Sequence, residues 1–273
     1  MKLAWMSDIH LSHVRYAEYR SLFDSAKMRS DALVITGDII SSDEILTTLG
    51  HISKIYTKPV YFVLGNHDFY YGSIKKTRLD VARLTNTTSN LFYLTGSPIM
   101  ELTPTTALVG HDGWADGRHG DMATSDVVIN DFLLIDEMQH WRDTYTNNPE
   151  LDKPPLRRAL EKQAAIAVDN LNMVLQPAVQ KYENIIVATH IPPFRESARY
   201  SGEQTDDNWL PYMTCKAVGD LLLQVAVEWP KCKFTILCGH THSQCEFDAA
   251  ENLKVITASA EYGKPTIQHI FDI

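Results

Sequence analysis

Short runs of apolar, often β-branched residues recur along the chain, and a polar motif follows each of them directly. Uninterrupted apolar runs of about four to eight residues are typical of buried strands. The runs are Leu3–Met6, Ala32–Ile35, Val60–Leu64, Ile185–Ala188 and Phe234–Cys238. We therefore expect five strands whose carboxyl ends lead into polar loops over a rigid sheet.

Apolar residues at helical spacing separate the first strands. This spacing predicts helices over residues 14–29, 43–55, 74–86 and 156–181. A βαβαβ opening favours parallel pairing with right-handed crossovers, and the strand-rich stretches 91–110 and 233–271 favour antiparallel additions. Two mixed β-sheets packed face to face and flanked by helices satisfy this pattern. The predicted fold class is α/β (α+β in some schemes), as a four-layer αββα sandwich.

The segment 111–155 does not follow this alternation of strands and helices. Glycines punctuate its start, and a weakly helical stretch runs over Asp126–Arg142. So long an excursion within a compact domain is usually functional or disordered, and Trp114, Trp141 and their neighbours make it too apolar for disorder. We predict a lid or insertion at 111–155 within one domain that spans residues 1–273. Packing of the segment into the core is the alternative.

The polar motifs that follow the five strands combine carboxylates, an amide and imidazoles. They read Asp8-Ile9-His10, Gly37-Asp38, Gly65-Asn66-His67-Asp68, Thr189-His190 and Gly239-His240-Thr241-His242. This donor set suits borderline divalent transition metals. The donors are too many for one four-coordinate ion. They suffice for two ions about 3.5–4 Å apart if one carboxylate bridges, and the sequence therefore predicts a dinuclear metal enzyme.

The order and the residue identities of the motifs resemble those of the calcineurin-like metallophosphoesterase superfamily, whose pattern runs D-x-H, G-D, G-N-H-[DE], H, G-H-x-H. The resemblance covers residues 8–242, and it also implies the αββα sandwich. It implies two divalent or trivalent transition-metal ions, with Mn, Fe and Zn all open. The implied ligands of the first ion are Asp8, His10, Asp38 and His242. Those of the second are Asp38, Asn66, His190 and His240, with Asp38 bridging.

The resemblance also implies a catalytic pair outside the metal sphere. His67 would be the catalytic histidine, and Asp68 would orient it by hydrogen bonding. In this scheme hydroxide generated on the metals attacks phosphorus, and His67 acts as general acid towards the leaving group.

The motifs of this chain differ from those of several known subclasses of the superfamily, and these differences reduce the number of candidate functions. The Ser/Thr protein phosphatases extend the second motif to G-D-x-V-D-R-G, which is absent after Asp38. Purple acid phosphatases begin with D-x-G, whereas position 10 is His. The lipid A precursor pyrophosphatases place Arg where this chain has His67. What remains resembles the broad group that contains cyclic-nucleotide and other small-substrate phosphodiesterases.

The leading interpretation is a metal-dependent phosphodiesterase that acts on a small phosphate ester, with nucleotides among the options. A phosphomonoesterase or protein phosphatase is the alternative, and a catalytically inactive scaffold of the same fold is the third hypothesis. The loop after His190 suits a substrate wall or an ordinary surface loop. Its residues Arg195 and Arg199, together with His111, are the predicted substrate-binding residues.

Composition restricts partners and location. A formal net charge of -9 disfavours extended nucleic-acid binding. No apolar stretch approaches the length of a membrane span, and a predicted ligand at position 8 leaves no room for a cleavable signal peptide. The cysteines show no C-x-x-C spacing, which favours reduced thiols and a cytoplasmic location. We expect a small-molecule phosphate ester as the partner, with the oligomeric state open.

Overall fold

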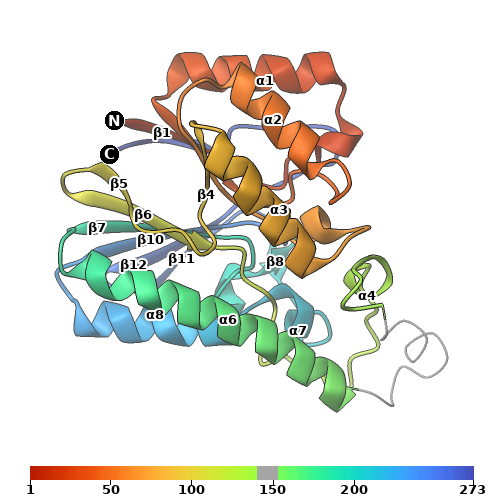
Figure 1. Ribbon diagram of the computed structural model, residues 1–273. Coiled ribbons are helices and arrows are strands. Elements are labelled where there is room, and N and C mark those ends of the chain that lie inside the picture. The colour runs from red at the N-terminus through yellow and green to blue at the C-terminus, as the bar shows by residue number, and fades with distance from the viewer. Residues whose placement is uncertain (140–152) are drawn as a thin grey trace.

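The structure, a computed structural model, describes residues 1–139 and 153–273. Two β-sheets lie face to face between layers of helices (Figure 1). The first sheet has the strand order β13-β1-β2-β3-β4. β1 to β4 pair in parallel, and β13 is antiparallel at the edge. These strands are β1 (Lys2–Met6), β2 (Ala32–Thr36), β3 (Val60–Val63), β4 (Leu91–Tyr93) and β13 (His269–Asp272).

The second sheet has the order β11-β12-β10-β7-β6-β5. Its four central strands are parallel, and the two edge strands are antiparallel. The strands are β5 (Met100–Thr103), β6 (Thr106–His111), β7 (Asn184–Thr189), β10 (Lys233–Cys238), β11 (Cys245–Ala250) and β12 (Leu253–Thr257). A separate short hairpin joins β8 (Arg199–Tyr200) to β9 (Glu203–Gln204).

Helices cover the outer face of each sheet (Figure 1). The helices over the first sheet are α1 (Tyr16–Arg29), α2 (Ile45–Ile55) and α3 (Ile74–Thr87), and those over the second are α6 (Lys153–Val179) and α8 (Lys216–Glu228). In β1, Leu3 and Trp5 enter the core between the sheets, whereas Ala4 and Met6 enter the core under the helices. This alternation buries both faces of the strand, which explains the continuous apolar run. The predicted αββα sandwich of two mixed sheets is confirmed.

Two helical segments differ from the sequence prediction. No helix is predicted from the sequence over residues 216–228, where α8 buries Val218, Leu222 and Val225. The helix predicted over Asp126–Arg142 is wrong for its described part, where only the single turn α4 (Asp131–Leu134) forms. Its backbone pairs with another loop instead: Tyr71 N–H donates to Leu134 O at 2.7 Å, and Asp136 N–H donates to Gly72 O at 3.0 Å.

The described part of the excursion, residues 111–139, packs onto the first sheet's helical side. Trp114, Phe132 and Ile135 are buried in the same core as the residues of α1 to α3. This part of the segment therefore contributes side chains to the core. Residues 140–152, which include Trp141, lie outside the described residues. In the part of the chain that the structure describes, no helix is both long and apolar enough to cross a membrane.

Candidate metal centre

The loops after β1, β2, β3, β7 and β10 meet at one edge of the sandwich and carry all the predicted metal ligands. The carboxyl ends of parallel strands are the usual place for such a site. Several ligand residues have left-handed backbone, which non-glycine residues adopt only where the surroundings hold them. Their φ values are Asp8 49°, His10 38°, Asp38 51°, His240 71° and His242 56°.

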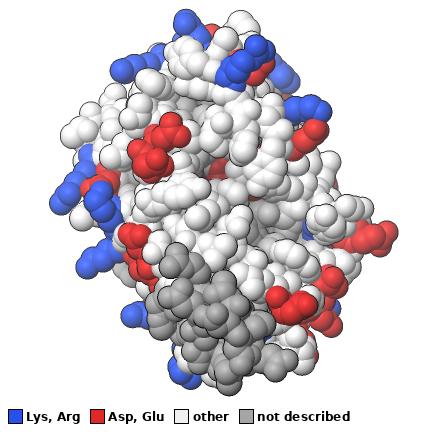
Figure 2. Space-filling view, turned by 90° about the vertical axis from the view of Figure 1, so that its right-hand side faces the viewer, with Lys and Arg blue, Asp and Glu red and all other residues white. Residues whose placement is uncertain are grey.

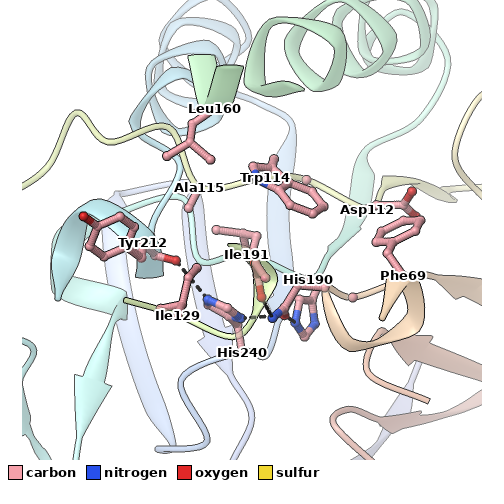
Figure 3. Close-up of a pocket in the computed structure, with 14 residues that line it drawn as sticks. Phe69, Asp112, Trp114, Ala115, Ile129, Leu160, His190, Ile191, Tyr212 and His240 are labelled. Carbon is pink, nitrogen blue, oxygen red and sulfur yellow. Dashed lines mark hydrogen bonds between the residues drawn. The ribbon is translucent and has the colours of Figure 1, made fainter. Parts of the chain in front are cut away.

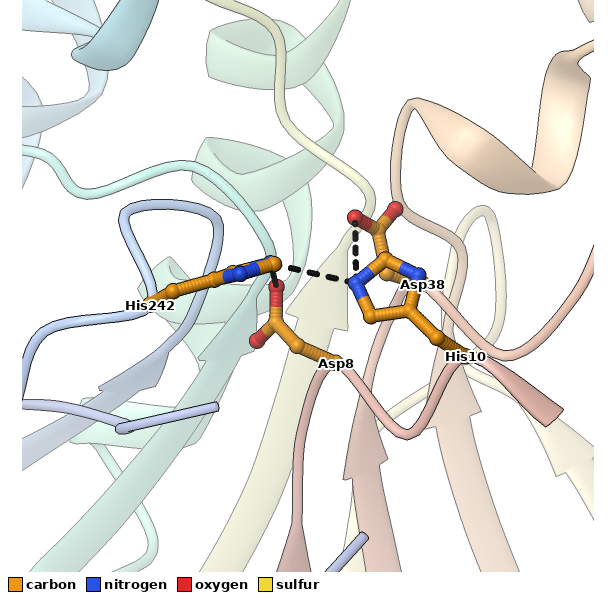
Figure 4. A group of neighbouring side chains, drawn as sticks. All are labelled: Asp8, His10, Asp38 and His242. Carbon is orange, nitrogen blue, oxygen red and sulfur yellow. Dashed lines mark hydrogen bonds and ion pairs between the residues drawn. The ribbon is translucent and has the colours of Figure 1, made fainter. Parts of the chain in front are cut away.

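One cluster of donors consists of Asp8, His10, Asp38 and His242, whose ligand atoms all lie within 4.8 Å of one another. His10 Nε2 lies 3.1 Å from His242 Nε2 and 3.7 Å from Asp38 Oδ2. His242 Nε2 lies 3.4 Å from Asp8 Oδ1. Figure 4 shows Asp8 and His10, from the loop after β1, converging with Asp38 and His242. The structure therefore brings together the four residues predicted to bind the first ion.

The second cluster forms around the other oxygen of Asp38. His190 Nε2 lies 3.3 Å from Asp38 Oδ1 and 3.1 Å from Asn66 Oδ1. His240 Nδ1 lies 3.0 Å from the same Asn66 oxygen. Because Oδ1 of Asp38 faces this cluster and Oδ2 faces His10, the carboxylate stands between the two sets of donors. That is the placement expected for a bridging ligand.

Hydrogen bonds on the far side of two imidazole rings test whether this second cluster fits a metal ion. His190 Nδ1 donates to Thr36 O at 2.9 Å, and His240 Nε2 donates to Tyr212 O at 3.0 Å (Figure 3). In the neutral form that binds a metal, the opposite nitrogens of these rings present lone pairs. Both face the carbonyl oxygen of Asn66, which is also an acceptor. Acceptors that face one another repel unless a cation lies among them, and such carbonyl partners are typical behind metal-binding imidazoles. The residues fit a metal ion.

Comparison with protein families decides the assignment. Residues 1–244 match the family model of calcineurin-like phosphoesterases. The chain belongs to the calcineurin-like phosphoesterase family. It is therefore a metal-dependent phosphoester hydrolase of a dimetal-dependent family, and Asp8, His10, Asp38 and His242 form a group that could hold a metal ion.

Solved structures share the fold of this phosphoesterase at low sequence identity. A dimetal phosphatase from Danio rerio is 17% identical, with 95% of this chain and 87% of that chain covered and a TM-score of 0.58. A phosphopantetheinyl hydrolase from Mycobacterium tuberculosis is 13% identical, with 96% and 89% covered and a TM-score of 0.58. A protein of Thermus thermophilus is 10% identical, with 94% and 88% covered and a TM-score of 0.54. No curated protein matches the chain.

Burial and charge set the protonation states of the phosphoesterase site. Burial opposes the charge of Asp38, but the neighbouring histidines, His190 foremost, lower its pKa overall. Burial lowers the pKa of His10 to about 4. Burial, followed by the charge of His190, also lowers the pKa of His240 to about 4. Burial opposes the charge of His190, but the nearby carboxylates, Asp38 foremost, raise its pKa overall. Metal binding requires an ionised carboxylate and unprotonated imidazole nitrogens, so His190 would give up a proton to bind an ion.

His67 lies beside the metal ligands and faces solvent more than they do. Its Nε2 is 3.9 Å from Asp38 Oδ2, and its side chain is 27% exposed. Its ring packs against His10 and Tyr70, with centroid separations of 4.7 and 4.3 Å. The backbone N–H of His67 donates to Asp38 Oδ1 at 2.9 Å. The loop thus holds the ring next to the donors.

The hydrogen bond predicted from Asp68 to His67 is wrong in this structure. The Asp68 carboxylate is fully buried and accepts backbone N–H bonds from Ile39 and Ile40 at 2.8 Å and from Gly65 at 2.7 Å. These amides belong to the loops after β2 and β3. Asp68 therefore joins the loop that carries Asp38 to the loop that carries Asn66 and His67. Sequence spacing did not reveal this, because backbone amides leave no sequence signal.

Close backbone approach explains a glycine in the last motif. A Cβ on Gly239 would overlap the carboxylate of Asp8 and the hydroxyl of Ser7. Asp8 Oδ1 also accepts the backbone N–H of His240 at 2.9 Å. The glycine thus lets the His240–His242 loop close over the end of β1, and this contact brings predicted ligands more than two hundred residues apart close together.

An open cleft of about 240 Å³ adjoins the metal ligands. Tyr262 and Trp209 line it and are 48% and 45% exposed. Tyr262 lies over the site, with its ring centroid 4.5 Å from that of His10 and 5.3 Å from that of His242. No sequence motif marks Tyr262 as a site residue. The full lining is Asp38, Asn66, His67, Tyr70, Val128, Ile129, Asn130, Asp131, Trp209, Met213, His240, His242 and Tyr262.

The three predicted substrate-binding residues do not line this cleft. His111 is 1% exposed on β6, where its Nδ1 accepts the Gly113 N–H at 3.0 Å. Arg195 pairs with the exposed carboxylate of Asp207, and Arg199 lies on β8. Proximity to His190 in sequence did not predict proximity to the cleft, because the chain turns away through a single helical turn and the β8–β9 hairpin.

Proposed function

We propose that this phosphoesterase hydrolyses a small phosphate diester that carries a planar, uncharged group such as a nucleobase. The observation that carries the proposal is the lining of the cleft beside the metal ligands. None of the described residues that line it is Lys or Arg, whereas Tyr70, Trp209 and Tyr262 present aromatic rings. The face of the molecule on the side of α4 and α7 (Leu210–Met213) is mostly uncharged at its centre, with Lys and Arg along its upper and left margins (Figure 2).

Charge favours a diester over more highly charged substrates. A phosphate diester brings one negative charge, whereas a monoester carries nearly two at neutral pH, because the second pKa of a phosphate ester is about 6. Enzymes that hold highly charged phosphates usually add Arg or Lys contacts. The cleft has none among its described lining residues, so the metal site is its main source of positive charge. A monoesterase or protein phosphatase would lack the Arg or Lys side chain that usually binds its doubly charged phosphate.

Aromatic exposure favours a planar group. Large rings that are nearly half exposed, as Trp209 and Tyr262 are, leave apolar surface in water at a cost in free energy. Stacking of a base on such a ring stabilises a complex by about 1–3 kcal/mol. A nucleotide diester would place its phosphate at the metal ligands and its base against these rings.

The side chains around the cleft have separate proposed roles in hydrolysis. Asp8, His10, Asp38 and His242 would hold one transition-metal ion, and Asp38, Asn66, His190 and His240 would hold the other. When bound, the two cations supply Lewis-acid charge at the phosphoryl oxygens and lower the pKa of water.

His67 would donate a proton from its Nε2 to the leaving alkoxide, because its ring lines the cleft without joining the donor clusters. Tyr70 packs against the ring of His67 and limits its rotation. The backbone bond from His67 N–H to Asp38 Oδ1 keeps the ring at a fixed place beside the bridging carboxylate. Retention of every ligand and of His67 argues against an inactive scaffold.

A comparison of two chromogenic substrates tests this proposal with Mn²⁺-loaded protein. Bis-p-nitrophenyl phosphate should be hydrolysed with at least about ten-fold higher kcat/KM than p-nitrophenyl phosphate, a difference of about 1.4 kcal/mol. Faster hydrolysis of p-nitrophenyl phosphate would establish a monoesterase instead.

A variant of Trp209 tests the role of the aromatic side chains that line the cleft. Trp209→Leu should lower kcat/KM for thymidine 5'-p-nitrophenyl phosphate by about 5- to 100-fold, as expected for a lost base stack. It should change little for methyl p-nitrophenyl phosphate, which has the same leaving group and no base. Tyr200→Leu is the matched control, because Tyr200 is 74% exposed and does not line the cleft. Equal losses on both substrates would contradict a stacking role for Trp209.

A further inference from the structure

A carboxylate from the excursion after β6 contacts a metal-ligating side chain. Asp131 is the first residue of α4 and is 5% exposed. Its Oδ1 accepts from Asn66 Nδ2 at 2.8 Å and from the Tyr70 hydroxyl at 2.9 Å. The Tyr70 oxygen in turn lies 3.2 Å from Asn66 Nδ2. Asp131 and Tyr70 thus hold the amino end of the Asn66 amide.

The direction of this amide decides whether Asn66 can bind a cation. Its carbonyl oxygen is a metal ligand, whereas its NH₂ group only donates hydrogen bonds. The oxygen faces His190 and His240 across 3.1 and 3.0 Å. On their other side both imidazoles bond to backbone carbonyls, and metal binding requires the nitrogens that face Asn66 to be unprotonated. In that state the histidine nitrogens cannot donate to the Asn66 oxygen, so the hydrogen bonds to Asp131 and Tyr70 hold the amide in the orientation seen.

The segment around Asp131 is fixed to the loop that carries Asn66. Phe132 and Ile135 are fully buried next to Asp131, and the backbone of 134–136 pairs with that of Tyr71 and Gly72. A carboxylate held this firmly limits the rotation of the amide it contacts.

We propose that Asp131 is a positioning residue for the second metal ion: it holds the Asn66 amide with its carbonyl oxygen towards His190 and His240. The inference rests on the dinuclear centre of the proposed function. It gives the excursion 111–139 a part in building the metal site beyond packing. The requirement at position 131 is a hydrogen-bond acceptor of the right size, not a negative charge.

Mn²⁺ titration of metal-stripped protein tests this by calorimetry, with free Mn²⁺ followed by electron paramagnetic resonance. Wild type should bind two ions per chain. Asp131→Leu, which keeps the size and removes the acceptor, should weaken one site by about 10- to 100-fold and leave the other unchanged. Asp131→Asn retains a carbonyl acceptor and should bind both ions within about three-fold of wild type, a difference of less than 1 kcal/mol. Asp136→Leu is the matched control, because Asp136 is exposed in the same segment.

The outcomes separate the inference from the dinuclear centre. If wild type binds only one ion, the dinuclear centre itself fails. If Asp131→Leu binds two ions like wild type, Asp131 has no positioning role. If Asp131→Asn is as weak as Asp131→Leu, the charge of the carboxylate acts rather than its hydrogen bond, and the inference is again overturned. The melting temperature of each metal-free variant shows whether it is folded.

A measurement on the unaltered side chain keeps the inference testable even if Asp131→Leu does not fold. In metal-free wild type, the Asn66 NH₂ resonances, assigned by their loss in Asn66→Ala, should exchange slowly with solvent because two buried oxygens hold the group. Rapid exchange before Mn²⁺ is added would show that the amide is free to rotate, which would overturn the proposal.

Discussion

Replacement of His67 by Ala separates proton transfer from metal binding. The His67 Nε2 atom lies 3.9 Å from Asp38 Oδ2, outside both donor clusters, and its side chain is 27% exposed and lines the cleft. Its loss removes no proposed ligand, so both ions should stay bound. Loss of a general acid lowers kcat by about 10²–10⁴-fold, equivalent to about 3–5 kcal/mol in the activation barrier.

The loss should depend on the leaving group. A p-nitrophenolate leaves with little need of a proton, whereas an alkoxide needs one, so His67→Ala should be impaired much more on a dialkyl or nucleotide diester than on bis-p-nitrophenyl phosphate. The assay is kcat for both substrate classes together with metal content by elemental analysis. His13→Ala is the control, because His13 contacts Tyr262, which lines the cleft, but belongs to neither donor cluster. Loss of metal, or an equal loss of kcat on both substrates, would refute the assignment.

Two further predictions concern stability. Burial lowers the pKa of His111 in the folded protein to about 4, whereas in the unfolded chain His111 binds a proton below about pH 6.5. The contribution of neutral His111 to the free energy of unfolding is therefore complete above pH 6.5 and falls by about 3 kcal/mol as the pH is lowered to 4. Urea unfolding of metal-free protein across this range should show a flatter pH dependence in His111→Gln, and an unchanged slope would contradict the burial argument. Asp68→Asn turns an acceptor of three backbone N–H bonds into a partial donor and should lower the free energy of unfolding by about 1–3 kcal/mol, with or without Mn²⁺. A variant as stable as wild type that loses kcat only on poor leaving groups would restore Asp68 to a direct role beside His67.

The two sheets, and the convergence of the predicted metal ligands at one edge, could be predicted from the sequence because both depend on local sequence features. Each ligand follows a buried strand directly, and parallel strands bring their carboxyl ends to one edge. Asp8, Asp38 and His190 could therefore be placed from their neighbours alone. The full arrangement of donors follows from the fold rather than from further sequence information.

The rest of the site depends on contacts between distant segments. Asp131 stands in a stretch with no regular period, and only the pairing of 134–136 with 71–72 brings it to Asn66. Tyr262 follows the last ligand by twenty residues and returns to cover His10 through a loop after β12. Asp68 was assigned to the wrong partner because its true partners are backbone amides.

The most direct test of the central claim is the number of ions that activity requires. Metal-stripped protein is titrated with Mn²⁺, and bound Mn²⁺ per chain is measured by elemental analysis alongside hydrolysis of bis-p-nitrophenyl phosphate. Two donor clusters that share Asp38 predict that activity reaches its maximum only as the second ion binds, and that Asp38→Ala weakens both sites together. Full activity with one ion per chain, or an Asp38→Ala variant that still binds two ions as tightly as wild type, would contradict the account.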